Sequence, residues 1–446
     1  MKIHFISLGC DKNLTDSEKM LALLAGAGHV ITDDPAEAEC IIVNTCCFIG
    51  DAKEESIFTL LEAAEQKKTG KCRLLLAGGC LAQRYQEDFF EEIPEVDGIL
   101  GTNSFDRILD LLAEAEEHPH TKILRPLTGH PNLTERLVTT GGHYAHLKIA
   151  EGCDKNCTYC VIPSVRGAYR SRPMEELLEE ARALAEGGVR ELILVAQETT
   201  LYGKDLYGEK RLPELLEALS EIPEIEWIRL QYCYPEEITP ELIGAVRDLP
   251  KVCKYLDIPI QSGSDRILKR MGRRTDSAHI RAIVARLREE IPEIALRTTL
   301  ISGFPGETPE DHQQTMQLVA DLAFDRLGVF PYSREEETPA AQMEDQIEES
   351  VKQARADEIM ALQEEIADEK AQELIGCELR VVVEGKVADE DAYVARSYMD
   401  APDVDGYVFI QTDRDLMSGD FVDVVITDAE AYDLIGELTD EDEPAE

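Results

Sequence analysis

The sequence predicts a multidomain α/β protein: an N-terminal parallel α/β domain, a partial (β/α)6 barrel and a small C-terminal antiparallel β-barrel. Three observations support this fold class. The chain has 446 residues, which is too long for one average domain. Short apolar runs alternate with helical patterns over most of its length, as in parallel sheets covered by helices. After Gly376 the pattern changes to short alternating strands.

Four strand–helix pairs are predicted within an N-terminal domain of residues 1–135. The strands are Lys2–Leu8, Glu39–Asn44, Arg73–Ala77 and Gly98–Gly101, and the helices are Thr15–Ala25, Asp51–Lys67, Leu81–Ile93 and Ser104–Glu117. Thr15 and Glu18 have the spacing of a capping box, which predicts that the first helix begins at Thr15. Residues 118–143 contain prolines and paired glycines without periodicity, so we expect a linker there.

Residues 140–372 contain six further strand–helix units followed by a long acidic helix, Gln346–Leu374. The predicted strands are Ala145–Ile149, Glu191–Ala196, Trp227–Tyr232, Leu256–Ile260, Leu296–Ile301 and Leu327–Tyr332. Six units indicate an incomplete parallel barrel, whose active site should lie at the carboxyl ends of the strands.

The C-terminal pattern predicts a barrel of about five strands over residues 373–438, followed by an acidic tail, 439–446. The strands read from the pattern are Leu379–Glu384, Ala392–Ser397, Tyr407–Gln411 and Phe421–Thr427.

The chain is strongly acidic, with a formal net charge of −45. Residues 371–446 carry 22 acidic and only four basic side chains. Nucleic-acid binding depends on Lys and Arg, so this composition disfavours it and fits a basic protein partner. The alternative is that every surface of the protein is acidic whatever its partner. There is no run of eighteen apolar residues and no signal-peptide pattern, so we expect a cytoplasmic protein without a membrane contact.

Twelve cysteines in a chain without a leader pattern indicate metal ligands or buried thiols rather than disulfides. Cys153, Cys157 and Cys160 form a CxxxCxxC motif after the first strand of the predicted barrel. Three thiolates can hold three irons of a 4Fe–4S cube and leave the fourth iron open. The alternative, structural zinc, needs a fourth ligand, and none follows at short spacing.

Cys10, Cys46 and Cys80 each follow one of the first three predicted strands. Because ligands bind at the carboxyl ends of parallel strands, these thiols are expected to converge on a second metal cluster. The alternative is three buried thiols, and Cys47 competes with Cys46 for the inward position. The remaining five cysteines match no ligand motif and are predicted to be packing residues: Cys40, Cys72, Cys233, Cys253 and Cys377.

The CxxxCxxC motif, with the aromatic Tyr159 before its last cysteine, resembles the radical S-adenosylmethionine (SAM) superfamily. Four further segments resemble the methylthiotransferases of that superfamily: Ser7–Asn13, Val43–Cys46, Gly79–Arg84 and Ser302–Thr308. The resemblance implies a cluster domain, a radical SAM barrel and a terminal TRAM domain. It also implies that Cys153, Cys157 and Cys160 bind the radical-generating 4Fe–4S cluster, and that Cys10, Cys46 and Cys80 bind a second, auxiliary 4Fe–4S cluster.

The same resemblance suggests contacts to SAM. Tyr159 would pack on the nucleobase, and Glu198 would meet the methionine amino group, unless it is simply a solvated acid. Arg297 would meet the methionine carboxylate or, equally, a barrel acid. Gly303 and Glu307 would form a cofactor-lining turn or a plain β–α connection.

Two positions depart from the family pattern, with Ser262 at a usual histidine and Glu337 at a usual glycine. The family modifies either adenosines in transfer RNA or small-subunit ribosomal protein twelve, and Asp11-Lys12-Asn13 resembles the protein-modifying branch. We therefore expect methylthiolation of the β-carbon of an aspartate on that basic ribosomal protein, free or on the ribosome. SAM would be consumed, and an electron-donor protein would be needed. The alternative is a transfer-RNA adenosine (2-methylthio) methylthiotransferase, which the charge disfavours.

Overall fold

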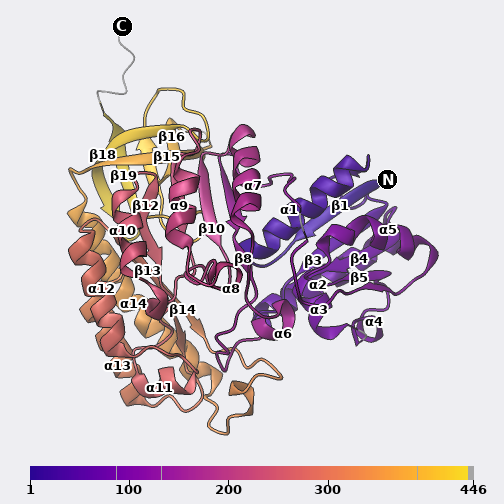
Figure 1. Cartoon of the computed structure of the whole chain (residues 1–446), viewed down its shortest axis with the longest axis horizontal. Coiled ribbons are helices and arrows are strands. Elements are labelled where there is room, and N and C mark those ends of the chain that lie inside the picture. Colours follow the sequence, from indigo (N-terminus) through magenta and orange to yellow (C-terminus); the bar gives the residue numbers. More distant parts are fainter. Residues whose placement is uncertain (87, 132, 389, 440–446) are drawn as a thin grey trace.

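The computed structural model describes residues 1–86, 88–131, 133–388 and 390–439. All of the predicted acidic tail except Thr439 lies outside the described residues. The strands form a six-stranded parallel sheet, a six-stranded partial barrel and a closed five-stranded barrel, in this order along the chain (Figure 1). The predicted fold class is therefore confirmed.

The N-terminal sheet has the strand order β2-β1-β3-β4-β5-β6, with every pairing parallel. Its strands are β1 Lys2–Ser7, β2 Val30–Ile31, β3 Cys40–Thr45, β4 Leu74–Gly78, β5 Gly98–Leu100 and β6 Thr121–Ile123. Its helices are α1 Asp11–Gly26, α2 Gly50–Thr69, α3 Gly79–Tyr85, α4 Asp88–Glu92 and α5 Ile108–Glu117, the last preceded by a 3-10 turn, η1 Phe105–Arg107. The central strands β3 and β4 are buried along their whole length, as their aliphatic runs require.

Three local predictions in this domain are wrong. Helix α1 begins at Asp11 rather than at Thr15, and there is no capping box, because the Thr15 hydroxyl donates to the carbonyl of Asp11 within the helix. The predicted helix Leu81–Ile93 is divided, since Gln86 has a left-handed φ of +44° at the end of α3. The expected linker contains β6, which extends the sheet.

The partial barrel has the order β14-β13-β12-β11-β10-β7. Its strands are β7 Tyr144–Lys148, β10 Glu191–Val195, β11 Trp227–Leu230, β12 Val252–Asp257, β13 Ala295–Ser302 and β14 Arg326–Pro331. The main helices covering it are α7 Met174–Glu186, α9 Leu212–Ser220, α10 Pro240–Asp248, α12 Ser277–Glu290 and α13 Pro309–Leu322. Shorter elements lie in the connections: β8 Ala150–Glu151, α6 Ile162–Arg166, β9 Arg170–Ser171, α8 Lys204–Tyr207, η2 Pro235–Glu237, α11 Asp265–Arg270 and η3 Ala340–Gln342.

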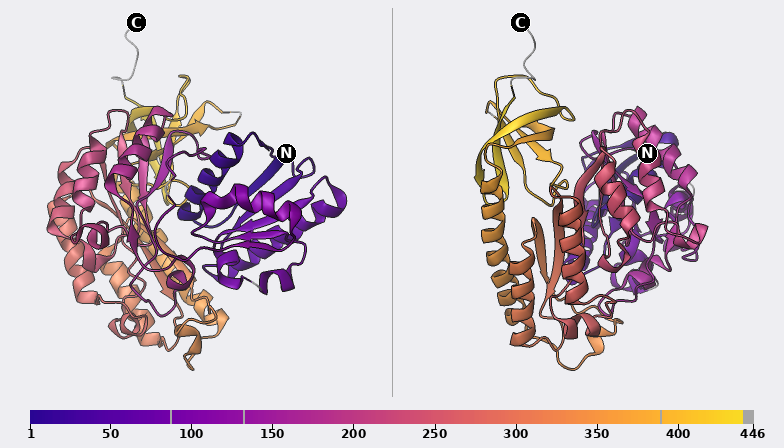
Figure 2. Two further views of the ribbon diagram at one scale, coloured as in Figure 1. Left: turned by 45° about the vertical axis from the view of Figure 1, so that its right-hand side comes forward. Right: turned by 60° about the vertical axis from the view of Figure 1, so that its left-hand side comes forward.

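Helix α14, Glu349–Glu373, runs from the partial barrel to the terminal barrel (Figure 2). The terminal barrel closes in the order β15-β16-β17-β19-β18. Its strands are β15 Glu378–Lys386, β16 Ala392–Ser397, β17 Val408–Gln411, β18 Phe421–Glu430 and β19 Asp433–Leu438. Within the described ranges, no helix is both long and apolar enough to cross a membrane.

A buried group of charges joins the N-terminal domain to the partial barrel. The carboxylate of Glu180, on α7, lies 2.9 Å from Lys19 of α1, 3.0 Å from Arg136 and 2.8 Å from Arg172. Arg136 also pairs with Glu18, whose buried side chain accepts from Thr139. Removing one partner from a buried ion pair costs stability, because the other charge stays buried without a counter-charge. This group of charges therefore holds the N-terminal domain on the partial barrel.

Replacing Glu180 by Gln should lower the free energy of unfolding at pH 7 by about 3–5 kcal/mol, because three buried cations lose a shared carboxylate. Burial alone would raise the pKa of Glu180, but Arg172, Lys19 and Arg136 lower it from 4.5 to about 2. The stabilisation is therefore complete above about pH 4.5 and is lost as the pH falls toward 2. Denaturant unfolding of both proteins between pH 7 and pH 2.5 measures this difference.

The control is Glu217→Gln, at an exposed position of α9, which should leave stability nearly unchanged at every pH. A gap between wild type and Glu180→Gln that stays constant down to pH 2.5 would contradict the assigned role of this carboxylate.

Candidate functional site

Cys10, Cys46 and Cys80 lie at the carboxyl ends of three neighbouring strands, β1, β3 and β4. Hydrogen bonds tie the three loops together. The Asn13 amide donates to the carbonyl of Leu8 at 2.6 Å and to that of Thr45 at 3.3 Å. The Thr45 hydroxyl donates to the carbonyl of Gly78 at 2.6 Å. The strand ends thus hold the first cysteine trio, Cys10, Cys46 and Cys80, at one edge of the sheet.

Two glycines permit this close approach. Gly9 has a φ of +86°, and a Cβ placed on it would lie 2.8 Å from the sulfur of Cys46. Gly79 has a φ of +87°, and a Cβ there would lie 2.4 Å from the carbonyl oxygen of Thr45. Cys47, in contrast, is completely buried in the apolar core of the domain. The sulfur facing the Cys10 loop is therefore that of Cys46.

Two thiols of the first trio, those of Cys46 and Cys80, are buried, whereas Cys10 is exposed. Burial raises the pKa of Cys46 to about 12, and the neighbouring Cys80 and Cys10 add to the effect. Burial also raises the pKa of Cys80, although Arg166 opposes this by donating from Nη2 to the sulfur at 3.4 Å. Thiols in such surroundings become thiolates when a cation or a metal replaces the proton.

Arg166 links this trio to the partial barrel. It ends α6, the short helix that follows Cys160, and its guanidinium donates to Asp16 at 2.8 Å and to Asn13 at 3.0 Å on α1. It also donates to Glu151 at 3.1 Å, next to the second cysteine trio. In Figure 1, α6 lies where the barrel meets the N-terminal domain.

Cys153, Cys157 and Cys160, the second cysteine trio, lie in the loop between β8 and α6, at the carboxyl end of the barrel. The amide of Cys160 donates to the carbonyl of Cys157 at 3.1 Å, which makes the loop compact. Thr158 fastens it to α11 through its hydroxyl, which donates to the carbonyl of Arg270 at 2.9 Å. Burial raises the pKa of Cys153 to about 11.

A three-residue segment connects the surroundings of the two trios. Tyr232 follows β11, and its hydroxyl donates to Asp11, beside Cys10, at 3.0 Å. Two residues later, the hydroxyl of Tyr234 lies 3.9 Å from the sulfur of Cys157. Tyr232 therefore contacts α1, the helix that follows Cys10, and Tyr234 contacts the second trio.

Glu198 is completely buried beside the second trio. Its Oε1 accepts from the Thr200 hydroxyl at 3.2 Å and lies 3.5 Å from the ammonium of Lys155. Its Oε2 is buried and has no hydrogen-bond partner among the described residues. Burial raises the pKa of Glu198 to about 7. An unsatisfied carboxylate oxygen at this place fits a ligand ammonium group.

Sequence reasoning missed Arg273. Its guanidinium lies 4.2 Å from the ring centroid of Tyr234, and in the described part of the chain its Nε and Nη1 are buried without hydrogen-bond partners. A buried cation with unsatisfied donors suits a ligand carboxylate. Its position in the loop after α11 gave no signal, because the run Arg273-Arg274 reads as an ordinary charged turn.

The other predicted SAM contacts have mixed outcomes. Tyr159 packs edge-on against Phe304, with ring centroids 6.4 Å apart, near the second trio. The guanidinium of Arg297 pairs with Asp257 at 3.1 Å and with Asp405 of the terminal barrel at 3.2 Å. The structure therefore supports the alternative stated for Arg297, a barrel acid as its partner.

Gly303 and Glu307 contact α14. The amide of Gly303 donates to the Glu307 carboxylate at 3.1 Å, and Arg355 of α14 pairs with that carboxylate at 2.7 Å. A Cβ on Gly303 would lie 2.3 Å from the Lys352 side chain. These contacts fix the turn against α14, and its role in lining a cofactor stays a prediction.

The family departures are accommodated locally. Ser262 is buried and accepts a hydrogen bond from the amide of Ser264 at 3.2 Å. Glu337 has a φ of +66°, the left-handed conformation that glycine favours, so the backbone turn persists with a side chain on it. Of the five predicted packing cysteines, four are buried, but Cys377 is exposed, because the turn after α14 lies at the surface.

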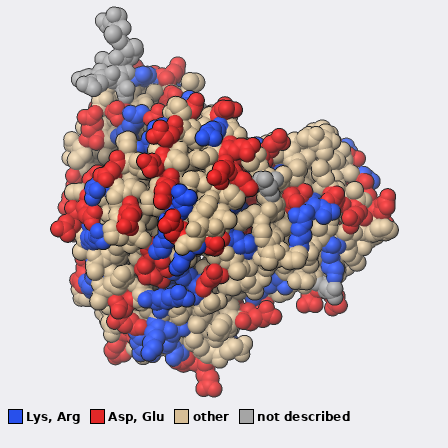
Figure 3. Space-filling view, viewed as in Figure 1, with Lys and Arg blue, Asp and Glu red and all other residues tan. Residues whose placement is uncertain are grey.

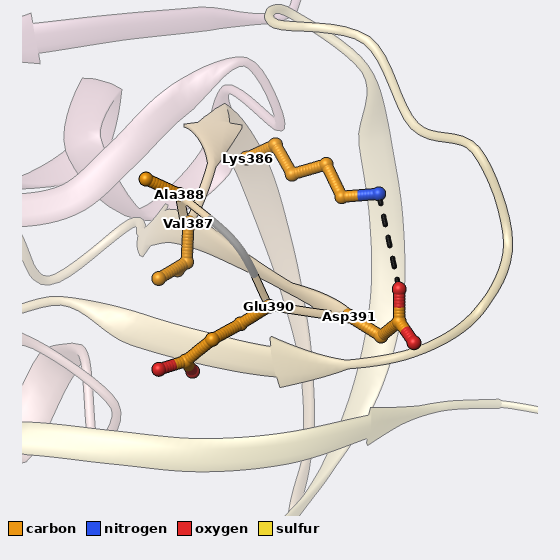
Figure 4. Close-up of a pocket in the computed structure, with 5 residues that line it drawn as sticks. All are labelled: Lys386, Val387, Ala388, Glu390 and Asp391. Carbon is orange, nitrogen blue, oxygen red and sulfur yellow. Dashed lines mark ion pairs between the residues drawn. The ribbon is translucent and has the colours of Figure 1, made fainter.

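No group of three or more His, Cys, Asp or Glu residues in the described ranges is arranged to hold a single metal ion. A 4Fe–4S cube differs from such a site because each thiolate binds a different iron. A surface hollow lies on the β15–β16 connection, where Lys386 reaches toward Asp391 at 4.0 Å (Figure 4). Its lining contains none of the predicted site residues.

Comparisons with known proteins match all three parts of the chain. Residues 147–319 match the Radical SAM superfamily, residues 2–101 match Uncharacterized protein family UPF0004, and residues 375–439 match the TRAM domain. Among solved structures, the radical SAM methyltransferase TsrM from Kitasatospora setae has a TM-score of 0.55. It is 13% identical, over 84% of this chain and 76% of that chain, and so supports the fold alone.

Fold and matches together define a radical SAM methylthiotransferase. A protein from Lachnoclostridium phytofermentans named ribosomal protein uS12 methylthiotransferase RimO is 57% identical over 98% of this chain and 99% of its own. Relatives of the same name are 51% identical in Geobacter sulfurreducens and 47% in Desulfitobacterium hafniense, each over 98% of both chains. The chain belongs to the RimO family. Membership of the superfamily implies a 4Fe–4S cluster and SAM.

The close approach at Gly79 can be tested by substitution. Gly79→Ala should lower the free energy of unfolding by more than about 1–3 kcal/mol, because the left-handed backbone is strained and the new Cβ meets Thr45. Gly26→Ala in α1 is the control, since a Cβ there meets nothing within 4 Å. Alanine in a helix should leave stability unchanged or slightly higher. Equal thermal unfolding of the two variants would contradict the packing of these strand ends.

Proposed function

We propose that the protein methylthiolates the β-carbon of an aspartate on ribosomal protein uS12, the small-subunit protein twelve. The observation that carries the proposal is that Tyr232 and Tyr234 connect the surroundings of two cysteine trios at the barrel mouth. Two adjacent metal centres suit a reaction that removes hydrogen from carbon and then adds sulfur to it. The names of the full-length relatives support the same substrate.

In this proposal Cys153, Cys157 and Cys160 hold a 4Fe–4S cluster, and Glu198 receives the ammonium group of SAM. Cys10, Cys46 and Cys80 hold a second 4Fe–4S cluster. When bound, these groups supply reductive cleavage of SAM and a sulfur atom for transfer. Partly buried groups such as Tyr159 limit access of water to the reacting centre. Both trios provide thiols without a disulfide, as cluster ligation requires.

Charge favours a protein substrate over transfer RNA. The terminal barrel has four basic side chains, and each is engaged. Arg396 is buried against Glu191 and Glu384, Arg380 pairs with Glu226, Lys386 pairs with Asp391, and Arg414 also has a partner. On the face drawn in Figure 3, acidic and basic side chains are intermixed, and the largest basic group lies toward the lower left. The net charge of −45 favours encounter with a lysine-rich partner. An electron-donor protein and encounter on the ribosome belong to the same proposal.

The substrate is tested by mass spectrometry of uS12 from cells with the gene intact, deleted and restored. The methylthio increment should be present, absent and present again, because in this proposal the gene encodes the enzyme that adds it. Hydrolysed transfer RNA from the same cells serves as the control and should not change. An increment on uS12 that survives deletion would exclude this substrate, and a loss of methylthioadenosine instead would favour the transfer-RNA alternative.

The two clusters can be separated by matched cysteine variants. Wild type reconstituted without oxygen should bind about eight irons, and Cys46→Ser about four, because one trio is broken. Cys47→Ser is the matched control, since the neighbouring thiol is buried in the apolar core, and it should keep about eight. Cys157→Ala should abolish formation of deoxyadenosine from SAM. Iron analysis and chromatography provide the measurements, and full iron content in Cys46→Ser would remove this thiol from the ligand set.

A further inference from the structure

Lys12 is a buried cation in an unfavourable position. It lies in the first turn of α1, where the positive end of the helix dipole disfavours a positive charge. Its side chain is only 7% exposed. Burial of an ammonium group is costly unless the group is paired and hydrogen-bonded. The position, directly after Cys10 and Asp11, therefore needs an explanation beyond surface charge.

Asp11 and Tyr232 stabilise the charge of Lys12, but an ammonium group has three N–H donors and can engage a further acceptor. The carboxylate that pairs with it among the described residues is that of Asp11, at 3.7 Å, which is longer than a charge-assisted hydrogen bond. That carboxylate instead accepts the Tyr232 hydroxyl at 3.0 Å. The Lys12 ammonium lies over the face of the Tyr232 ring, 3.3 Å from its centroid. A cation held in this way keeps hydrogen-bond donors for a ligand.

Tyr232 itself is held rigidly. Its φ of +59° is left-handed and strained for a tyrosine. Its amide donates to the Asp257 carboxylate at 3.0 Å, and its carbonyl accepts from the amide of Thr199 at 3.1 Å. Contacts from two other strand ends hold the strained backbone of Tyr232, and this fixes the direction in which its ring points. The Lys12 ammonium packs on this ring and so lies at the junction between the two trios.

We propose that the Lys12 ammonium binds the side-chain carboxylate of the residue that is modified, and so selects aspartate at this site. The inference rests on the proposed function. A carboxylate that meets Lys12 places its adjacent carbon beside the loop of Cys10 and opposite the mouth of the barrel. Lys12 acts through charge and position, with no covalent step. A neutral nucleobase offers no negative charge, so the ammonium would keep only its 3.7 Å pairing with Asp11 among the described residues.

A double-mutant cycle tests the contact. Labelled full-length uS12, and uS12 with the modified aspartate replaced by asparagine, are titrated with the cluster-loaded protein, and binding is followed by fluorescence anisotropy. Wild type should bind the aspartate form about 10- to 100-fold more tightly than the asparagine form, as expected for a charged hydrogen bond. Lys12→Gln should bind both forms within about threefold of each other, and Lys12→Arg should retain most of the preference.

Controls separate this role from a structural one. Lys68→Gln, at an exposed position of α2, should keep the wild-type preference. A merely structural role would lower the iron content or the thermal stability of Lys12→Gln and weaken both forms of uS12 equally. An unchanged preference in Lys12→Gln, or no preference in wild type that still modifies uS12, would overturn the role of Lys12 alone. Wild type that neither binds nor modifies uS12 would overturn the proposed function as well.

Discussion

The arrangement of the site depends on one buried cation, Arg166. Its guanidinium leaves the barrel loop that follows the second cysteine trio and enters the N-terminal domain, where it meets Asp16, Asn13 and the sulfur of Cys80. On its own side of the junction it meets Glu151, which also pairs with Lys148 at 2.8 Å. These buried charges have their partners only when the N-terminal domain is docked on the partial barrel. The pairing therefore fixes the relative orientation of the two domains.

The same device holds the terminal barrel at the opposite end of the partial barrel. Glu191, the first residue of β10, lies 2.7 Å from Arg229 and from Arg396, the latter on β16. Arg297 similarly joins β12 to Asp405 of the terminal barrel. The N-terminal domain therefore docks at the carboxyl end of the barrel strands and the terminal barrel at their amino end.

Charge acts on two length scales in this protein. The acidic surface affects encounter with a partner and is screened by salt beyond a Debye length. The cations near the trios, Lys12, Arg166 and Arg273, are buried and much less screened. A net charge of −45 thus coexists with buried cations near the cysteine trios. Attraction of a basic partner and recognition of one carboxylate are compatible for this reason.

The sequence by itself determined the three folds and their order, because hydrophobic periodicity and strand-following motifs are local properties. It also singled out six cysteines, since ligand spacing and position after a strand are readable in one dimension. It failed at α1, where the capping spacing of Thr15 and Glu18 was overridden by the burial of Glu18 against Arg136.

The tertiary structure showed that the sulfur of Cys46 faces the Cys10 loop and that Arg297 pairs with two carboxylates. It alone showed that Lys12, Arg166 and Arg273 are buried at the junction. A lysine or arginine reads as a solvated charge until long-range packing encloses it. That enclosure joins residues more than a hundred positions apart, as with Lys12 and Tyr232, and no local pattern encodes it.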